Sequence, residues 1–156
     1  MKSNSKIYPT QSHLIPQNPT IISTLLYLYI IRYHLFTPDI DKALDELAHH
    51  VGSFSATQNL LKGIMSGLLI AALVWMLPSV SNKFLLIFFM TYLIGLGDFT
   101  HVVVGSTEMS YLVWQGEASI SKYLFTFLIP TTIGNIIGGT GVFTLLIYGQ
   151  VTEELE

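Results

Sequence analysis

The sequence predicts an all-α membrane protein whose middle membrane helix is broken. Two observations predict the membrane: 51% of the residues are hydrophobic and only 11% are charged, whereas globular domains carry about 25% charged residues. The stretch GDFTHVVVGST predicts the break, because it places an acid, a histidine and glycines between apolar segments. In a bilayer, ionisable groups and irregular backbone occur where protein or a water-filled cavity satisfies them. The stretch therefore predicts the wall of a pathway.

The composition excludes several kinds of site and partner. The chain has no cysteine, which excludes disulfides, thiolate metal sites and cysteine nucleophiles. Its net charge of −3 gives no reason to expect nucleic acid as a partner. We expect no cofactor and no enzymatic activity.

Residues 1–57 are expected to form a polar tail, a short apolar segment and an amphipathic surface helix. Residues 1–19 are polar and contain three prolines, a composition typical of disorder. Residues 20–31 are apolar but shorter than the roughly 20 residues of a spanning helix. They predict an interfacial or re-entrant helix, or a span completed by the residues up to 36.

The sequence Thr37-Pro38-Asp39 is typical of a helix start, with a hydroxyl cap, a proline and an acid in the first turn. Apolar residues then recur at helical spacing and predict one buried face, with the acids facing away. These apolar residues are Ile40, Leu44, Leu47 and Val51. Adjacent His49 and His50 predict solvated side chains rather than a metal pair, because neighbouring residues on a helix do not face each other.

Residues 58–150 predict three membrane spans, followed by an acidic tail at residues 151–156. The first span covers about residues 60–78 after a linker, and Lys62 lies near enough to its start to reach the interface. The last span covers about residues 123–149.

The middle span is predicted to be two half-helices. Residues 84–96 are apolar but too few to cross a bilayer at 1.5 Å per residue. The irregular stretch follows, and a second apolar piece covers residues 109–114. Half-helices around an irregular loop are typical of ligand sites in transporters.

Small residues predict how the first and last spans pack. Gly63 and Gly67 recur four residues apart in the first span, and Gly134 and Gly138 do so in the last. Such ridges allow helices to approach closely. Asn135 places an amide at membrane depth, which predicts either an interhelical hydrogen bond or a pore-lining role.

Residues 98–106, together with GNIIGG at residues 134–139, resemble the formate/nitrite transporter family, in a divergent branch. The resemblance covers about residues 58–150. It implies an aquaporin-like helical bundle of two inverted three-helix repeats, assembled as a pentamer in the plasma (inner) membrane. The implied substrates are small monovalent anions such as formate or nitrite, moved with or without a proton. Only the C-terminal repeat is matched, so we expect a truncated member, with half of the pore wall supplied from elsewhere.

The resemblance also implies the pore residues, which are Asp98, Thr100, His101, Gly105, Ser106 and Asn135. The central histidine of the family falls on His101, and the asparagine of its last helix falls on Asn135. Better-known members have a glutamate at the position of Thr100, an asparagine at that of Gly105 and a gate-lining asparagine at that of Gly67. The substrate and the gating therefore do not follow from the resemblance.

We expect His101 to supply a proton or a transient positive charge to the anion, because the unperturbed pKa of histidine lies near neutral. Asp98 is expected to orient the imidazole. Backbone amides of a half-helix that starts after Gly105 would add positive potential. Glu108 is expected at the outer mouth or as a cap of that half-helix.

Two other functions remain open at the level of sequence. The spans could form a membrane component that transports nothing, or Asp98, His101 and Glu108 could be the ligands of an intramembrane metal enzyme. The orientation is open too. The family topology places the turn at residues 79–83 in the cytoplasm, whereas Lys62 and Lys122 outnumber the lysine of that turn.

Overall fold

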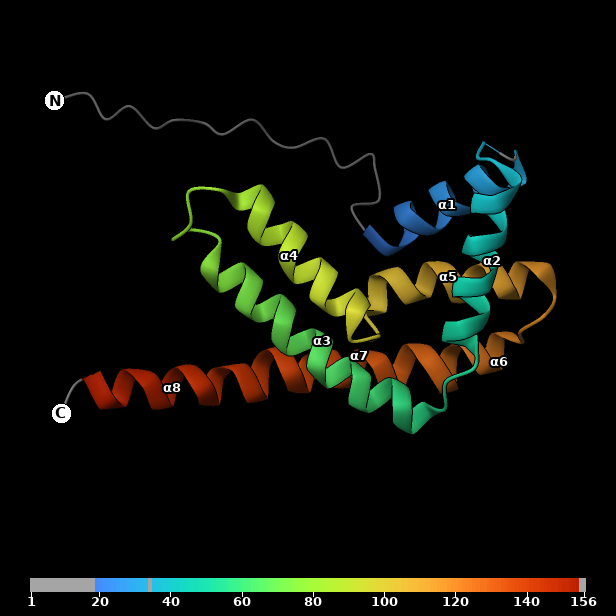
Figure 1. Ribbon diagram of the computed structural model, residues 1–156. Helices are drawn as coiled ribbons and strands as arrows, with labels where there is room; N and C mark the ends of the chain where they lie inside the picture. The colour runs from blue at the N-terminus through green and yellow to red at the C-terminus, as the bar shows by residue number, and fades with distance from the viewer. Residues whose placement is uncertain (1–18, 34, 155–156) are drawn as a thin grey trace, which may run out of the picture.

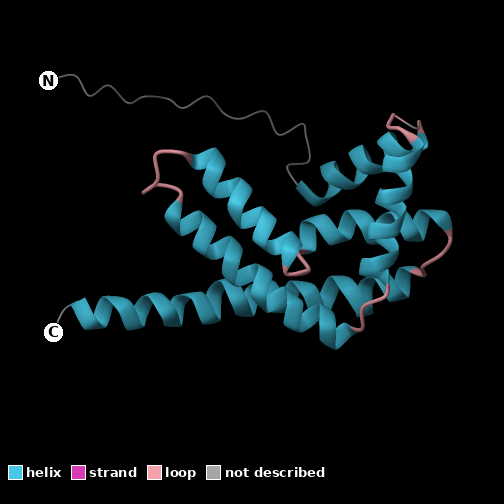
Figure 2. Ribbon diagram, viewed as in Figure 1, coloured by secondary structure: helices cyan, strands magenta, loops and turns pink. Residues whose placement is uncertain are grey.

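The computed structural model describes residues 19–33 and 35–154. Most of the predicted polar tail and the last two residues of the acidic tail lie outside this range. The described chain is helical, without strands (Figure 2), which confirms the all-α prediction. Its helices are α1 (Pro19–Arg32), α2 (Pro38–Gly52), α3 (Ala56–Met76), α4 (Lys83–Leu96) and α5 (Val102–Gln115), then α6 (Ile120–Lys122), η1 (Tyr123–Leu128), α7 (Ile129–Ile136), η2 (Ile137–Val142) and α8 (Phe143–Glu154).

Two helices are long and apolar enough to cross a membrane, and both occur where the sequence predicts spans. They are Ala56–Met76, with 21 residues, and Ile120–Gly149, with 30 residues. The second, called the long helix below, runs from α6 into α8. At 1.5 Å per residue α3 is about 32 Å long, close to the thickness of the hydrocarbon core. It begins earlier than predicted, because Ser55 and Gln58 form a capping box.

The long helix crosses α3 at their small residues (Figure 1). A Cβ added to Gly67 would meet the backbone of Asn135, and one added to Gly138 would meet the carbonyl of Ile64. A Cβ added to Gly63 or Gly134 would also meet backbone of the other helix at the same crossing, less closely at Gly63. Backbones that touch in this way hold two helices together in a bilayer, where no hydrophobic force between them exists.

The middle membrane helix is broken at residues 97–101, as predicted. Asp98 has a φ of 54°, the one positive φ of a non-glycine residue in the described chain, and a helix cannot continue through such a backbone. The break is shorter than the sequence suggests, because α5 already begins at Val102, with His101 as its N-cap. Residues 102–106, expected to be irregular, are therefore helical.

The first two helices pack against α5 (Figure 1). Tyr27 of α1 contacts Tyr111 of α5 edge-on, with ring centroids 5.7 Å apart, and Ser23 Oγ lies 3.0 Å from Thr107 Oγ1. The apolar stretch of α1, Ile21–Ile30, is shorter than a membrane span. This agrees with the short helix expected there.

The buried face of α2 is only partly the one that the sequence predicts, since Leu44 and Val51 are half-buried. The helix begins at Pro38 as expected, but Ile40 and Leu47 of the predicted apolar face are 45% and 52% exposed. Ala48 and Gly52 are buried instead. Small residues face α5 because the helices come close: a Cβ on Gly52 would meet the side chain of Leu112. The prediction was wrong for Ile40 and Leu47, because close approach to α5, rather than hydrophobicity, selects the fully buried residues.

Candidate functional site

Three polar residues of the two spanning helices hold the break in place, Ser66 and Asn135 through their side chains and Asn59 through its backbone carbonyl, and we call them the break clamp. Ser66 Oγ donates to Thr100 O at 2.6 Å, and Asn135 Nδ2 donates to the same oxygen at 3.3 Å. Thr100 Oγ1 donates to Asn59 O at 3.1 Å. Asn135 Oδ1 accepts from the N–H of Val102 at 3.2 Å. These bonds satisfy backbone groups that a break leaves without helical partners.

Asn59 also stabilises a second irregularity, in the long helix. Pro130 has no N–H to donate to Thr126 O, four residues earlier. The amide of Asn59 is buried and donates to that oxygen, with Nδ2 and O 2.8 Å apart. One residue of α3 thus bonds both the break and the proline-bearing turn.

An ionic cluster of His50, Lys62 and Asp98 fixes the other side of the break. Lys62 Nζ lies 2.6 Å from Asp98 Oδ2 and donates to Asp98 O at 2.9 Å. His50 Nε2, from α2, lies 3.1 Å from the same carboxylate oxygen. Lys62 Nζ also lies 4.3 Å from the centre of the Phe54 ring. These contacts hold Asp98 in its left-handed conformation, which costs about 1–2 kcal/mol for an L residue.

The ionic cluster corrects two sequence-based expectations. Asp98 binds Lys62 and His50, so it does not orient His101 as expected. Lys62 reaches the break instead of the membrane interface. His49 and His50 are both exposed, as predicted, and each also lies near an acid: His49 Nε2 is 2.8 Å from a carboxylate oxygen of Glu117.

His101 lies between two cavities. Cavity 1, of about 490 Å³, lies between α3 and the long helix, where Gly67 and Asn135 line it. Cavity 2, of about 290 Å³, lies between α2, α4, α5 and the break. His101 and Ile70 line both cavities. The imidazole is therefore placed where a solute moving between the two cavities would meet it.

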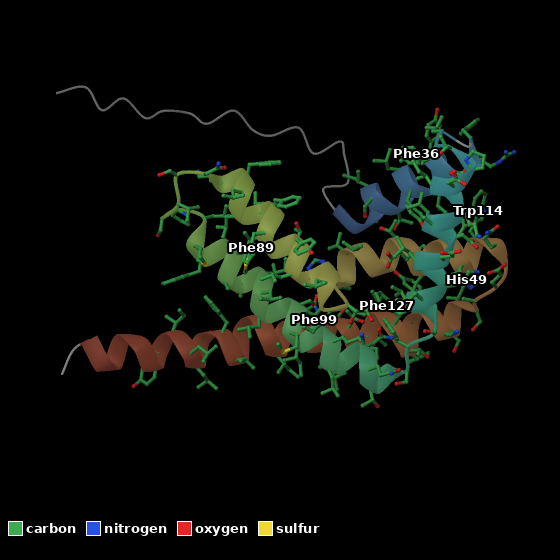
Figure 3. The ribbon with its side chains drawn as sticks, in the orientation of Figure 1. Phe36, His49, Phe89, Phe99, Trp114 and Phe127 are labelled. Carbon is green, nitrogen blue, oxygen red and sulfur yellow. The ribbon has the colours of Figure 1, made fainter. Side chains whose placement is uncertain are left out.

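Of the other predicted site residues, three line cavity 2 and one, Ser106, does not. Asp98, Thr100 and Gly105 line cavity 2, although the hydroxyl of Thr100 is bonded to Asn59. A Cβ on Gly105 would meet the ring of buried Phe127, which Figure 3 labels beside α5. Ser106 is fully buried and lines none of the cavities described here.

Asn135 makes the interhelical hydrogen bond that is one of the two roles the sequence left open, while the pore-lining role stays a prediction. Its amide bonds α3, the break and α5, and the residue also lines cavity 1. In the described part of the chain, no three His, Cys, Asp or Glu side chains are grouped as metal ligands. The metal-enzyme alternative thus has no ligand cluster there.

Sequence reasoning missed Asn59, Lys62 and Ser66. Their spacing of three and four residues places them on one face of a helix, and all three meet the break. Polar residues recurring on one face of an apolar span were the available signal. It could indicate a polar partner, but not that the partner lies about forty residues further along the chain.

Replacing Lys62 by methionine is expected to lower the free energy of unfolding by about 1–2 kcal/mol, because the strained Asp98 loses the partner of its carbonyl and its carboxylate. Lys42→Met is the matched control: Lys42 Nζ lies 3.7 Å from Glu46, and both side chains are mostly exposed, so its loss costs less than about 0.5 kcal/mol. Thermal unfolding in detergent compares the two. Equal shifts would show that Lys62 does not stabilise the break.

Comparison with known proteins gives a family match over most of the described chain. The sequence profile of the family described as formate/nitrite transporter matches residues 20–149. The match thus includes α1 and α2, which precede the region of the motif-based resemblance.

Two curated relatives are similar to this chain. Inner membrane protein YfdC of Escherichia coli (strain K12) is 38% identical over 122 residues, which are 78% of this chain and 39% of that protein. Uncharacterized transporter YHL008C of Saccharomyces cerevisiae (strain ATCC 204508 / S288c) is 37% identical over 93 residues, 56% of this chain and 14% of that protein. The chain therefore spans well under half the length of either relative. No solved structure matches it.

Proposed function

The chain belongs to the formate/nitrite transporter family, and from this premise we propose that it forms one wall of a pathway for small monovalent anions such as formate or nitrite. Family membership supports a role in membrane transport. The anion pathway is supported above all by the position of His101, which lies at the break and lines the cavities on both sides of it.

The proposed mechanism addresses the cost of dehydrating an anion. That cost rises as the surroundings become less polar. His101 offers an imidazole whose neutral form keeps a ring N–H that can donate a hydrogen bond to the anion. The positive end of the α5 dipole adds to this, because the helix begins at Val102, directly after His101. Sequence reasoning expected that helix start after Gly105, at a point further from the imidazole.

The break clamp and the ionic cluster hold this site without using His101. Each binds the backbone or side chain of a neighbouring residue of the break, and neither includes the imidazole. The site therefore has a fixed frame around a histidine that remains available to a solute. A frame of this kind lowers the free energy needed to organise the site when an anion arrives.

We further propose that protein outside these 156 residues completes the pathway, in an aquaporin-like bundle that forms pentamers in the plasma (inner) membrane. The exposed aromatic rings of α4 support the proposal that this surface is covered in the membrane. Phe84 stacks on Phe88 and Phe88 on Tyr92, with ring centroids 6.5 and 6.4 Å apart, respectively. Such a row needs lipid or protein against it. The name of YfdC places that relative in an inner membrane.

Anion flux through the protein in its native assembly tests the proposal. After purification and reconstitution in liposomes, we expect formate and nitrite to enter faster than into protein-free liposomes, with divalent sulfate excluded. Flux at the protein-free level for every monovalent anion would contradict the proposal. It would instead favour a membrane component that transports nothing.

A further inference from the structure

Glu108 lies where the sequence did not place it. It was expected at the outer mouth or as a cap, but it lies in the middle of α5, which spans Val102–Gln115. It follows His101 by seven residues, or two helical turns, so both are on one face and about 10 Å apart along the axis. Both line cavity 2.

Glu108 also lines a third cavity, of about 370 Å³, between α1, α2 and α5. Tyr27 of α1 and Leu44 of α2 lie on its wall. Glu108 and Val104 line both this third cavity and cavity 2, much as His101 and Ile70 line both cavity 1 and cavity 2. The three cavities form a series in which each boundary carries one titratable side chain.

The carboxyl group of Glu108 makes no hydrogen bond or ion pair with a described residue, in contrast to four other acids of the described chain. Asp98 is bound by Lys62 and His50, and Asp45 accepts from the hydroxyl of Tyr111. Glu46 and Glu117 lie within ion-pair distance of Lys42 and His49, respectively. A partly buried acid without a partner at membrane depth is a candidate for function.

The groups facing Glu108 do not supply a free positive charge. Cavity 2 brings His50 from α2, and Asp98 and His101 from the break, toward it. The third cavity brings Tyr27 from α1. The residues that α3 and α4 contribute to cavity 2 are uncharged, namely Ile70, Thr91, Ile94 and Gly95. No lysine of the described chain lines either cavity, and Lys62, which binds Asp98 of cavity 2, is already paired with that carboxylate.

A negative charge on Glu108 would oppose an anion in the same cavity, since like charges repel strongly in surroundings less polar than water. A proton removes that repulsion. The neutral carboxylic acid also gains an O–H that can donate a hydrogen bond to an anion. One protonation step thus changes cavity 2 from repelling an anion to binding it.

We propose that Glu108 is the proton-binding group of the pathway, and that a monovalent anion occupies cavity 2 only together with a proton on this carboxyl group. This inference rests on the proposed function. The proton comes from water and binds a carboxylate oxygen as the anion enters, and the O–H then donates to the anion. When the anion leaves, the proton returns to water or stays for the next anion.

The test is nitrite flux into liposomes between pH 5 and 8 with Glu108→Gln, whose neutral amide mimics the protonated acid. We expect wild-type flux to fall by up to about tenfold per pH unit at the alkaline end, as one required proton dictates. The flux of Glu108→Gln is expected to stay near the acidic wild-type value throughout. Glu46→Gln, at an exposed acid of α2, is the control and is expected to keep the wild-type slope.

Two results would overturn the inference: a folded Glu108→Gln that keeps the wild-type slope, or one that is inactive at every pH. A wild-type protein without flux would instead overturn the proposed function. If the variant does not fold, proton uptake by the wild-type protein tests the inference instead. When nitrite is added to the wild-type protein in weakly buffered solution, the protein is expected to take up about one proton per bound anion. Binding without proton uptake overturns the inference.

Discussion

Replacing His101 by phenylalanine is expected to reduce anion flux about 10- to 100-fold at every pH. The phenyl ring fills much of the space of the imidazole but cannot donate to an anion or carry a proton. Losing one hydrogen bond to a charged group costs about 1.5–3 kcal/mol, and each 1.36 kcal/mol corresponds to a factor of ten in rate. The measurement is formate and nitrite flux into liposomes.

His49→Phe is the matched control for this experiment. His49 is bound to Glu117 and lines neither cavity 1 nor cavity 2, so its loss is expected to leave flux unchanged. Thermal unfolding in detergent shows whether both variants are folded. A folded His101→Phe protein with wild-type flux would remove His101 from the mechanism.

Gly138→Ala is expected to lower the free energy of unfolding by about 2–3 kcal/mol, the upper part of the range for overpacked sites. The added Cβ would meet the carbonyl of Ile64, and backbone of a neighbouring span cannot move aside as a side chain can. The crossing of α3 and the long helix would open, and with it the break clamp. Thermal unfolding in detergent measures the effect.

Gly141→Ala makes the same chemical change in the same helix and serves as its control. A Cβ at Gly141 would meet nothing within 4 Å. Because alanine favours helix over glycine by up to about 1 kcal/mol, we expect this variant to be neutral or slightly more stable. Equal destabilisation by both substitutions would contradict the claim that the helix crossing requires glycine at position 138.

Local signals predicted the elements of the fold. The acid and glycines after Leu96 predicted a broken helix, and the structure breaks there. Thr37 and Pro38 predicted the start of α2. Each of these features depends on residues adjacent in the chain, so composition and spacing are enough to locate it.

Contacts between distant segments were not predictable in the same way. Nothing in the sequence around Asn59 and Ser66 indicates that these two clamp residues bond Thr100, because the contact exists only in the folded chain. The buried face of α2 is decided by how closely α5 approaches it. Glu108 could have been connected with His101 through their seven-residue spacing, but only the cavities show that they share one space.

Water access to position 101 tests most directly whether His101 faces a pathway. The chain has no cysteine, so His101→Cys can be labelled with a charged thiosulfonate that does not cross membranes. We expect the thiol to react from water and to be protected by formate or nitrite. Ile136→Cys, at an exposed residue beside Asn135 that lines neither of the two cavities at His101, is expected to stay unlabelled in lipid. If the folded His101→Cys protein reacts no faster than Ile136→Cys, the imidazole does not face water, and the proposed pathway is contradicted.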